Sequence, residues 1–174
     1  MKTLRFPALL SFSLVLLMAS CKKGDTGPAG QDGNANVRLF TYSNITFTGV
    51  YNLQLSGISQ GQMDSSMVLI YYNPSSEVAS SWYPVPGLGS GSTYDMRYLL
   101  YQSSPSPSIY TISLRAMLPN GSGSYGSQLT FTKVRVFLVP ASSVTVGGRG
   151  VADSESILNT EDYYSVCRYF NVQP

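Results

Sequence analysis

The chain has 174 residues, with 11 Lys and Arg against 9 Asp and Glu, and no histidine. A charge balance this close to neutral excludes both a basic field for nucleic acid and an acidic excess that would attract cations. Without histidine a Ser-His-acid relay cannot be built, and with two cysteines in all the usual zinc ligands are missing. We therefore expect no cofactor and no nucleic-acid partner.

Residues 1–20 have the layout of a secretory signal peptide. Lys2 and Arg5 precede an apolar run over residues 6–18, and two small residues lead into Cys21. The run is shorter than the about 20 apolar residues that a transmembrane helix needs. The junction Met-Ala-Ser-Cys resembles the lipobox of bacterial lipoproteins, so we expect Cys21 to become the first mature residue and to carry the lipid. A plain signal peptide with an incidental cysteine is the alternative.

A lipid on Cys21 makes the membrane the first partner expected for this chain. Several acyl chains on one residue exceed what stable anchoring requires. Lys22 follows the cysteine, so the aspartate that retains some lipoproteins in the inner membrane is absent, and we expect the outer membrane. Whether the protein faces the periplasm or the cell surface stays open at this stage.

Residues 21–35 are expected to form the lipidated cysteine and a collagen-like tether. Glycine falls at every third position from Gly24 to Gly33, which is the collagen period. Four triplets with one proline, Pro28, are too few for a lasting triple helix without trimerisation elsewhere. A Gly-rich polar segment that cannot pack a core is typical of a tether, and a collagen trimer is the alternative.

Residues 36–174 are expected to form one folded domain, whose apolar residues alternate as in half-buried strands. Residues 37–42 and 51–55 predict the first two strands. Residues 67–72 form a continuous apolar run, which predicts a central strand buried on both faces. Two further segments predict strands with inward-facing residues Tyr94, Met96, Tyr98 and Leu100 in the first and Tyr110, Ile112, Leu114 and Ala116 in the second.

The longest expected strand covers residues 129–139. Its apolar positions are odd up to Phe131 and even from Val134 onward, which predicts a bulge near Thr132 and Lys133 or a strand that moves between two environments. Turn clusters rich in Gly, Pro and Ser separate the strands. This pattern is typical of an all-β protein, so the expected fold is an antiparallel β-sandwich, with jelly-roll and Ig-like topologies both open.

The last segment has the period of a helix. Four apolar residues recur at i, i+3, i+4 and i+7 on one face: Tyr163, Val166, Cys167 and Phe170. Residues 161–170 are therefore expected to form a short C-terminal helix against the sandwich, with Thr160 as its N-cap. A buried and unreactive thiol is expected for Cys167 in preference to a reactive one.

Together these segments resemble a family of uncharacterised bacterial outer-membrane lipoproteins with a collagen-like segment behind the lipidated cysteine. The likeness rests on the stretches GPAGQDGNANV, VLIYYN…WYPVPG, TFTKVRVFLVPAS and EDYYSVCRYFNV, and it covers nearly the whole mature chain. The resemblance implies a compact β-sandwich on a tether and supplies no catalytic residues.

Two enzyme-like patterns are attributed to chance. Residues 57–61 match G-x-S-x-G, yet histidine is absent and the segment is expected between strands, not at a strand-to-helix turn. Residues 121–126 match G-x-G-x-x-G, which needs a following helix where a strand is expected. We expect no enzyme; a glycoside-active carboxylate pair is the less favoured alternative, drawn from Asp64, Glu77, Asp95, Asp153, Glu155, Glu161 and Asp162.

Tyrosine is present in excess, at thirteen residues against a single tryptophan. Exposed rings serve carbohydrate and protein contacts, although strand tyrosines more commonly pack in the core or at its rim. The candidate contact residues are Tyr71, Tyr72, Trp82, Tyr83, Tyr98 and Tyr101. We expect a structural or protein-interaction role at the cell envelope, which a broad apolar patch would favour. A glycan-binding accessory module is the alternative, favoured by an exposed aromatic strip beside a polar residue such as Asn73 or Gln102.

Overall fold

The structure, a computed structural model, describes residues 37–141 and 158–174. The expected signal peptide, Cys21 and the collagen-like tether lie outside these residues, as do Asp153 and Glu155. The described residues form strands β1 (Arg38–Thr48), β2 (Val50–Ser56), β3 (Ser66–Pro74), β4 (Tyr83–Val85), β5 (Gly87–Leu88), β6 (Asp95–Pro105), β7 (Ser108–Met117) and β8 (Gln128–Pro140), and helices α2 (Gln60–Asp64), η1 (Ser90–Ser92) and α3 (Tyr163–Tyr169).

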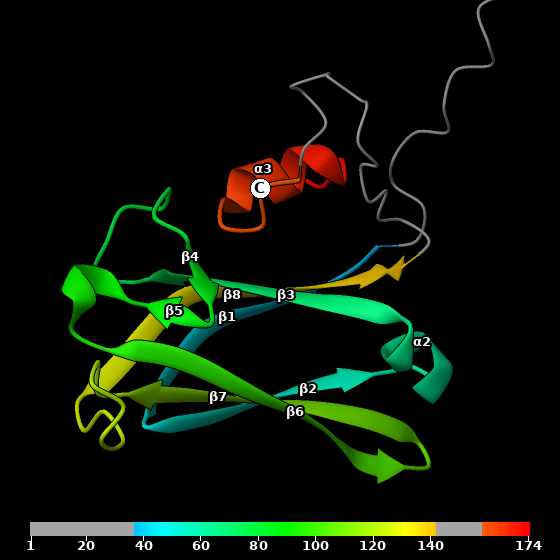
Figure 1. The fold of residues 1–174 in the computed structure, drawn as a ribbon, viewed down its shortest axis with the longest axis horizontal. Coiled ribbons are helices and arrows are strands. Elements are labelled where there is room, and N and C mark those ends of the chain that lie inside the picture. The colour runs from blue at the N-terminus through cyan, green and yellow to red at the C-terminus, as the bar shows by residue number, and fades with distance from the viewer. Residues whose placement is uncertain (1–36, 142–157) are drawn as a thin grey trace, which may run out of the picture. The chain divides into compact units, whose positions relative to one another are not determined.

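The strands form two four-stranded antiparallel sheets. Sheet A has the order β1-β8-β3-β4 and sheet B the order β2-β7-β6-β5. Figure 1 shows the two sheets stacked, with α3 on the far side of sheet A from sheet B. The expected all-β sandwich with a short C-terminal helix is therefore confirmed. The order is not that of an Ig domain, whose first two strands pair within one sheet, because β1 and β2 belong to different sheets.

The chain changes sheet between β1 and β2 at Gly49. This residue has a φ of +71°, and a Cβ added there would lie 2.6 Å from the Ser124 hydroxyl oxygen. Only glycine meets both conditions without strain. The bend makes β1 an edge of sheet A and β2 an edge of sheet B.

The core between the sheets follows the predicted alternation. On sheet B the buried residues are Leu53, Leu55, Met96, Tyr110, Ile112, Leu114 and Ala116, with Tyr51, Tyr98 and Leu100 packed at their margin. On sheet A the opposing residues include Ile70, Tyr72, Phe131, Val134, Val136 and Leu138. Burying a large apolar side chain contributes about 1.5–3 kcal/mol, so this two-sided stripe is the main source of stability.

Strand β8 contains the predicted bulge. Thr132 and Lys133 are both exposed between the buried residues Phe131 and Val134. Where β8 pairs with β3, Asn73 lies opposite Lys133 and Pro74 opposite Phe131, so Thr132 is the extra residue. Beyond the bulge every residue from 134 to 139 is buried, because one face of β8 meets sheet B and the other meets α3.

Helix α3 covers the outer face of sheet A. Tyr163, Val166, Cys167 and Phe170 are all buried there, as their spacing predicts, in a cluster with Tyr71, Phe137 and Val139. The prediction of Thr160 as N-cap is wrong, because Asp162 caps the helix by accepting a hydrogen bond from the Tyr164 backbone N–H. The carbonyl of Thr160 instead accepts a hydrogen bond from the Tyr71 hydroxyl at 2.6 Å.

Three short elements are not apparent from the sequence pattern. Helix α2 has a capping box in which Ser59 and Gln62 satisfy each other's backbone N–H groups, a signal hidden in a segment that otherwise resembles a loop. Strands β4 and β5 flank Pro86 and carry the chain from sheet A to sheet B. At three and two residues they are too short to show any period.

Candidate functional site

The six aromatic residues singled out by the sequence do not form one surface. Tyr71 and Tyr72 are 1% and 0% exposed, and because neighbours on a strand point to opposite faces, Tyr71 lies under α3 and Tyr72 between the sheets. The others are Trp82, Tyr83 and Tyr98, which are partly buried, and Tyr101, which is 46% exposed. The aromatic strip that would favour a glycan is therefore not assembled from these residues.

Trp82 is engaged in packing α3 onto sheet A. Its ring stacks on that of Tyr163, with centroids 4.0 Å apart and planes 17° from parallel. The Arg135 guanidinium lies 5.8 Å from the Trp82 centroid and donates hydrogen bonds to the Tyr163 hydroxyl and the Gln173 carbonyl. This cluster ties α3 and the residues after it to β8.

Tyr83 and Asn73 hold the loop between β3 and β4. The Tyr83 hydroxyl donates to the two carboxylate oxygens of Glu77 at 2.9 and 3.0 Å. Hydrogen bonds from Ser90 and Tyr83 keep the pKa of Glu77 below its usual value. The buried Asn73 amide donates to the carbonyls of Val78 and Ser81, so these polar groups are occupied by their own chain.

The outer face of sheet B is the open face of the sandwich. Within the described residues no element packs on it, whereas α3 covers the outer face of sheet A (Figure 1). Three cross-strand rows of side chains run from β6 through β7 to β2: Arg97–Arg115–Val50, Leu99–Ser113–Asn52 and Tyr101–Thr111–Gln54.

Exposed apolar side chains lie on the two strands of this face that flank β7, which are β6 and β2. Leu99 is 48% exposed and Val50 52%, while Ser113 and Thr111 on the central strand are buried among their neighbours. Of the apolar and aromatic residues on this face, the sequence analysis named only Tyr101 as a candidate contact residue. The signal for Leu99 is its parity: in the stretch RYLLY, Tyr98 and Leu100 point inward, so Leu99 must point out.

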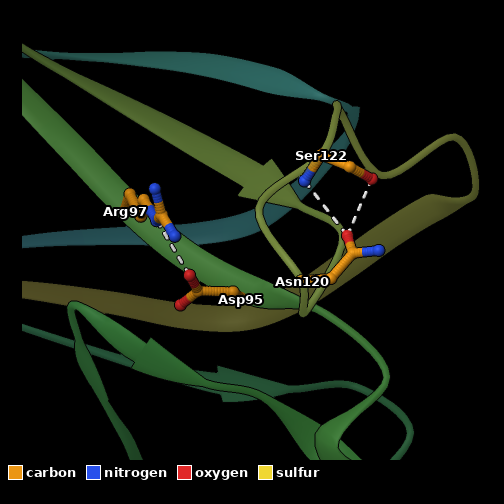
Figure 2. Close-up of polar contacts among 4 residues, drawn as sticks. All are labelled: Asp95, Arg97, Asn120 and Ser122. Atoms are coloured by element: carbon orange, nitrogen blue, oxygen red, sulfur yellow. Dashed lines mark hydrogen bonds and ion pairs between the residues drawn. The ribbon is translucent and has the colours of Figure 1, made fainter.

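One end of the open face is charged. Arg97 Nε lies 2.8 Å from Asp95 Oδ2, and the exposed Arg115 stands directly opposite Arg97 on β7. Figure 2 shows the ion pair beside the turn after β7, where Asn120 Oδ1 accepts hydrogen bonds from the backbone N–H and the hydroxyl of Ser122. Asp95 offsets the repulsion that two opposed arginines would otherwise feel. The face therefore joins exposed apolar and cationic groups, a composition typical of contact surfaces.

A cavity of about 380 Å³ lies beside α2, at one end of sheet A. Its lining comprises Val37, Arg38, Gln62, Ser65, Ser66, Leu138 and Pro140. The Ser65 and Ser66 hydroxyls donate to carbonyls of α2, and Arg38 donates to the Gly57 carbonyl at 2.6 Å. The Ser65 and Ser66 hydroxyls and the Arg38 guanidinium in this lining are thus hydrogen-bonded within the chain itself.

The G-x-S-x-G segment is a helix start. The expectation that it does not form a strand-to-helix turn is wrong, because α2 follows directly after Ser59. The Ser59 hydroxyl accepts the Gln62 backbone N–H as an N-cap, which gives this serine a structural role. The G-x-G-x-x-G segment is followed by β8, as expected.

The remaining reactive groups are dispersed or buried. Cys167 is 3% exposed, and burial raises the pKa of its thiol. Among the described residues, no three His, Cys, Asp or Glu side chains lie close enough together to hold a metal ion. Across residues 37–141 and 158–174, the helices are all too short or too polar to cross a membrane.

Compared with known proteins, the chain matches no protein-family model, no curated protein and no solved structure.

Proposed function

We propose that this chain is a non-catalytic lipoprotein of the bacterial outer membrane, which contacts a protein partner of the cell envelope through the outer face of sheet B. The observation that carries the proposal is the difference between the two outer faces. Sheet A is closed by α3, while sheet B presents Leu99, Tyr101 and Val50 at about half exposure. Exposed apolar side chains gathered on one face of a sheet are typical of a surface that contacts another protein.

The anchoring part of the proposal is supported by the order of segments in the sequence. A signal peptide, the Met-Ala-Ser-Cys junction and the Gly-x-y segment precede β1 in that order. Fully extended, residues 22–35 would span about 40 Å at ~3.1 Å per residue. That reach would hold the sandwich clear of the lipid headgroups and leave the outer face of sheet B accessible.

The non-catalytic part is supported by how three of the five described acidic side chains are used. Glu77 accepts from Tyr83, Asp95 pairs with Arg97, and Asp162 caps α3. Each acid thus stabilises a local turn or strand end, and the chain has no histidine to act as a base.

A glycan-binding module is the second candidate. Tyr101 shares its row with the Gln54 amide on the far side of β7, whereas Gln102, the next residue on β6, points to the other face of the sheet. Sugar binding commonly relies on several stacking rings, and this face supplies one exposed ring beside Leu99 and Val50. Apolar groups with tyrosine and arginine suit a protein partner better.

The test uses a photo-crosslinking amino acid in the full chain, in cells that carry the protein. It replaces the exposed Arg115, on the central strand β7 of the open face, or, as matched control, the exposed Arg168 on α3. The proposal predicts protein adducts from position 115 and few from position 168. Equal adducts from both positions, or none from 115, would contradict it, and glycan adducts from 115 would favour the second candidate.

A further inference from the structure

The two edges of sheet B differ in whether side chains bond to their outward-facing backbone groups. The first edge is strand β2. The Tyr42 hydroxyl donates to the Gln54 carbonyl at 2.6 Å, and Arg38 donates to the carbonyls of Ser56 and Gly57. Burial raises the pKa of Tyr42 to about 12, so its hydroxyl remains a donor at physiological pH. Side chains from β1 thus occupy acceptors that an added strand would need.

The second edge is β6, of which β5 covers only the first two residues. β5 pairs with Asp95 and Met96 and then ends, as Figure 1 shows. From Arg97 to the shift in register after Gln102, β6 pairs on one side alone, with β7. Residues 97–103 are therefore an unpaired edge within the described part of the chain.

The direction of the free backbone groups follows from the ladder. The Ala116 N–H donates to the Gly49 carbonyl, so even-numbered residues of β7 bond towards β2 and odd-numbered ones towards β6. Odd residues of β6 lie opposite odd residues of β7. Tyr98, Leu100 and Gln102 consequently direct their N–H and C=O groups to the free edge.

Between Tyr98 and Gln102 the edge lacks the usual protections, which here occur only at its two ends, as Arg97 and the bulge after Gln102. Residues 97–103 contain no proline and one charge, Arg97, and Leu99 and Tyr101 on it are half exposed. Among the described residues no side chain bonds to the backbone of Tyr98, Leu100 or Gln102, in contrast to the β2 edge. An open, apolar edge of this kind is a template for pairing with another strand.

We infer that the β6 edge is a site of self-association. Two copies of the chain pair antiparallel along it, about a two-fold axis that passes between the Leu100 residues of the two copies. Hydrogen-bonded pairs must join residues whose backbone groups both face the edge, which are the even ones. Centring on Leu100 pairs Tyr98 with Gln102 and uses the whole free stretch, from the end of β5 to the bulge.

The same register accounts for the exposed side chains. It sets Leu99 of each copy opposite Tyr101 of the other, so each of these side chains gains an apolar neighbour while its outer side stays open. Arg97 falls opposite Ser103, which avoids opposing like charges. A surface that complements itself in this way is the mark of an isologous dimer, and a second copy therefore fits the edge better than an unrelated strand. The pairing would join two copies of sheet B into one eight-stranded sheet.

The test is register-specific disulfide formation in the full chain, solubilised in detergent. Leu99→Cys and Tyr101→Cys are made as separate single variants, then co-expressed and mildly oxidised. Directly opposed residues of a non-hydrogen-bonded pair lie within disulfide range, whereas diagonal neighbours do not. The co-expressed pair should give several-fold more disulfide dimer on a non-reducing gel than either variant alone. Val50→Cys with Val78→Cys, both exposed, is the matched control.

A second pair of variants tests the interface without cysteine chemistry. Leu99→Lys/Tyr101→Lys should sediment as a monomer, as should Leu99→Glu/Tyr101→Glu, and mixing the two should restore the dimer through opposite charges. A wild-type chain that is monomeric at tens of micromolar, control cross-linking equal to that of the pair, or a Leu99→Cys chain that cross-links alone as well as the pair would overturn the inference. The inference does not rest on the proposed partner, because adducts at Arg115 are read separately.

Discussion

The single residue Arg135 joins sheet A to helix α3, which packs on its outer face. It is 8% exposed, and its guanidinium lies beside the rings of Trp82 and Tyr163 while donating to a hydroxyl and a carbonyl. Neither ion pair found among the described residues involves it. A planar cation that both stacks and donates in two directions is a role that lysine does not fill.

Arg135→Lys should therefore destabilise the folded chain by about 1–3 kcal/mol, through lost hydrogen bonds and ring contacts. Urea unfolding measures the change. Arg115→Lys, at an exposed position, is the control and should stay within about 0.5 kcal/mol of wild type. Equal midpoints for the two variants would show that the guanidinium does not hold the layers together.

The residue scale is also where sequence reasoning loses detail. Tyr71 and Tyr72 both belong to an apolar run, which predicts burial but not which layer each ring meets. That choice depends on α3, a segment about 90 residues away in the chain. Thr160 and Asp162 are both good N-caps by type, and the choice between them follows from where the Tyr163 ring packs on sheet A.

At the scale of elements, β8 and α3 depend on each other for the burial of their apolar faces. The bulge at Thr132 changes which residues face sheet B, from Phe131 to the even-numbered Val134, Val136 and Leu138, and leaves the odd-numbered Phe137 and Val139 facing α3. A helix of seven residues is not stable alone, so α3 exists because its apolar face is buried. The sequence periods predicted both features, whereas β4, β5 and α2 were too short to be predicted.

Phe170→Ala tests whether α3 is part of the cooperative fold. The ring is 0% exposed, so its truncation should cost about 3–5 kcal/mol, measured by urea unfolding. Tyr169→Ala, at a partly buried position beside it, should cost less. An unchanged unfolding midpoint for Phe170→Ala would mean that α3 docks without stabilising the sandwich.

The alkylation rate of Cys167 is a second measure of whether α3 stays packed on sheet A. Its thiol is buried and has a raised pKa, so the reactive thiolate is both scarce and shielded. Alkylation of Cys167 should be slow in the native protein and fast in urea. Rapid labelling without denaturant would show that α3 opens readily.

At the scale of the whole molecule, the sequence predicted the fold class and the helix but not the proposed contact surface. Alternation assigns each residue to a face, and two sheets with a helix follow from that. It does not say which outer face the helix covers, because Leu39 and Leu69 on one face and Leu99 on the other are equally apolar. The contact surface depends on that tertiary choice.

The proposed tether predicts where the full chain is cut by proteases. Limited proteolysis should cut within residues 22–35 and leave a resistant product that begins near β1. A Gly-x-y segment with no face to pack gives proteases an accessible backbone. A resistant, cooperatively melting trimer that retains residues 24–35 would favour the collagen alternative.

In the proposed arrangement, the lipid on Cys21 holds the sandwich at the outer membrane. The measurement that tests it most directly is the intact mass of the protein extracted from the membrane fraction. We predict a chain that begins at Cys21 and carries the mass of its acyl chains, and a Cys21→Ser variant that remains unprocessed or leaves the membrane fraction. An unacylated wild-type chain, with processing and membrane partition unchanged in Cys21→Ser, would contradict the account.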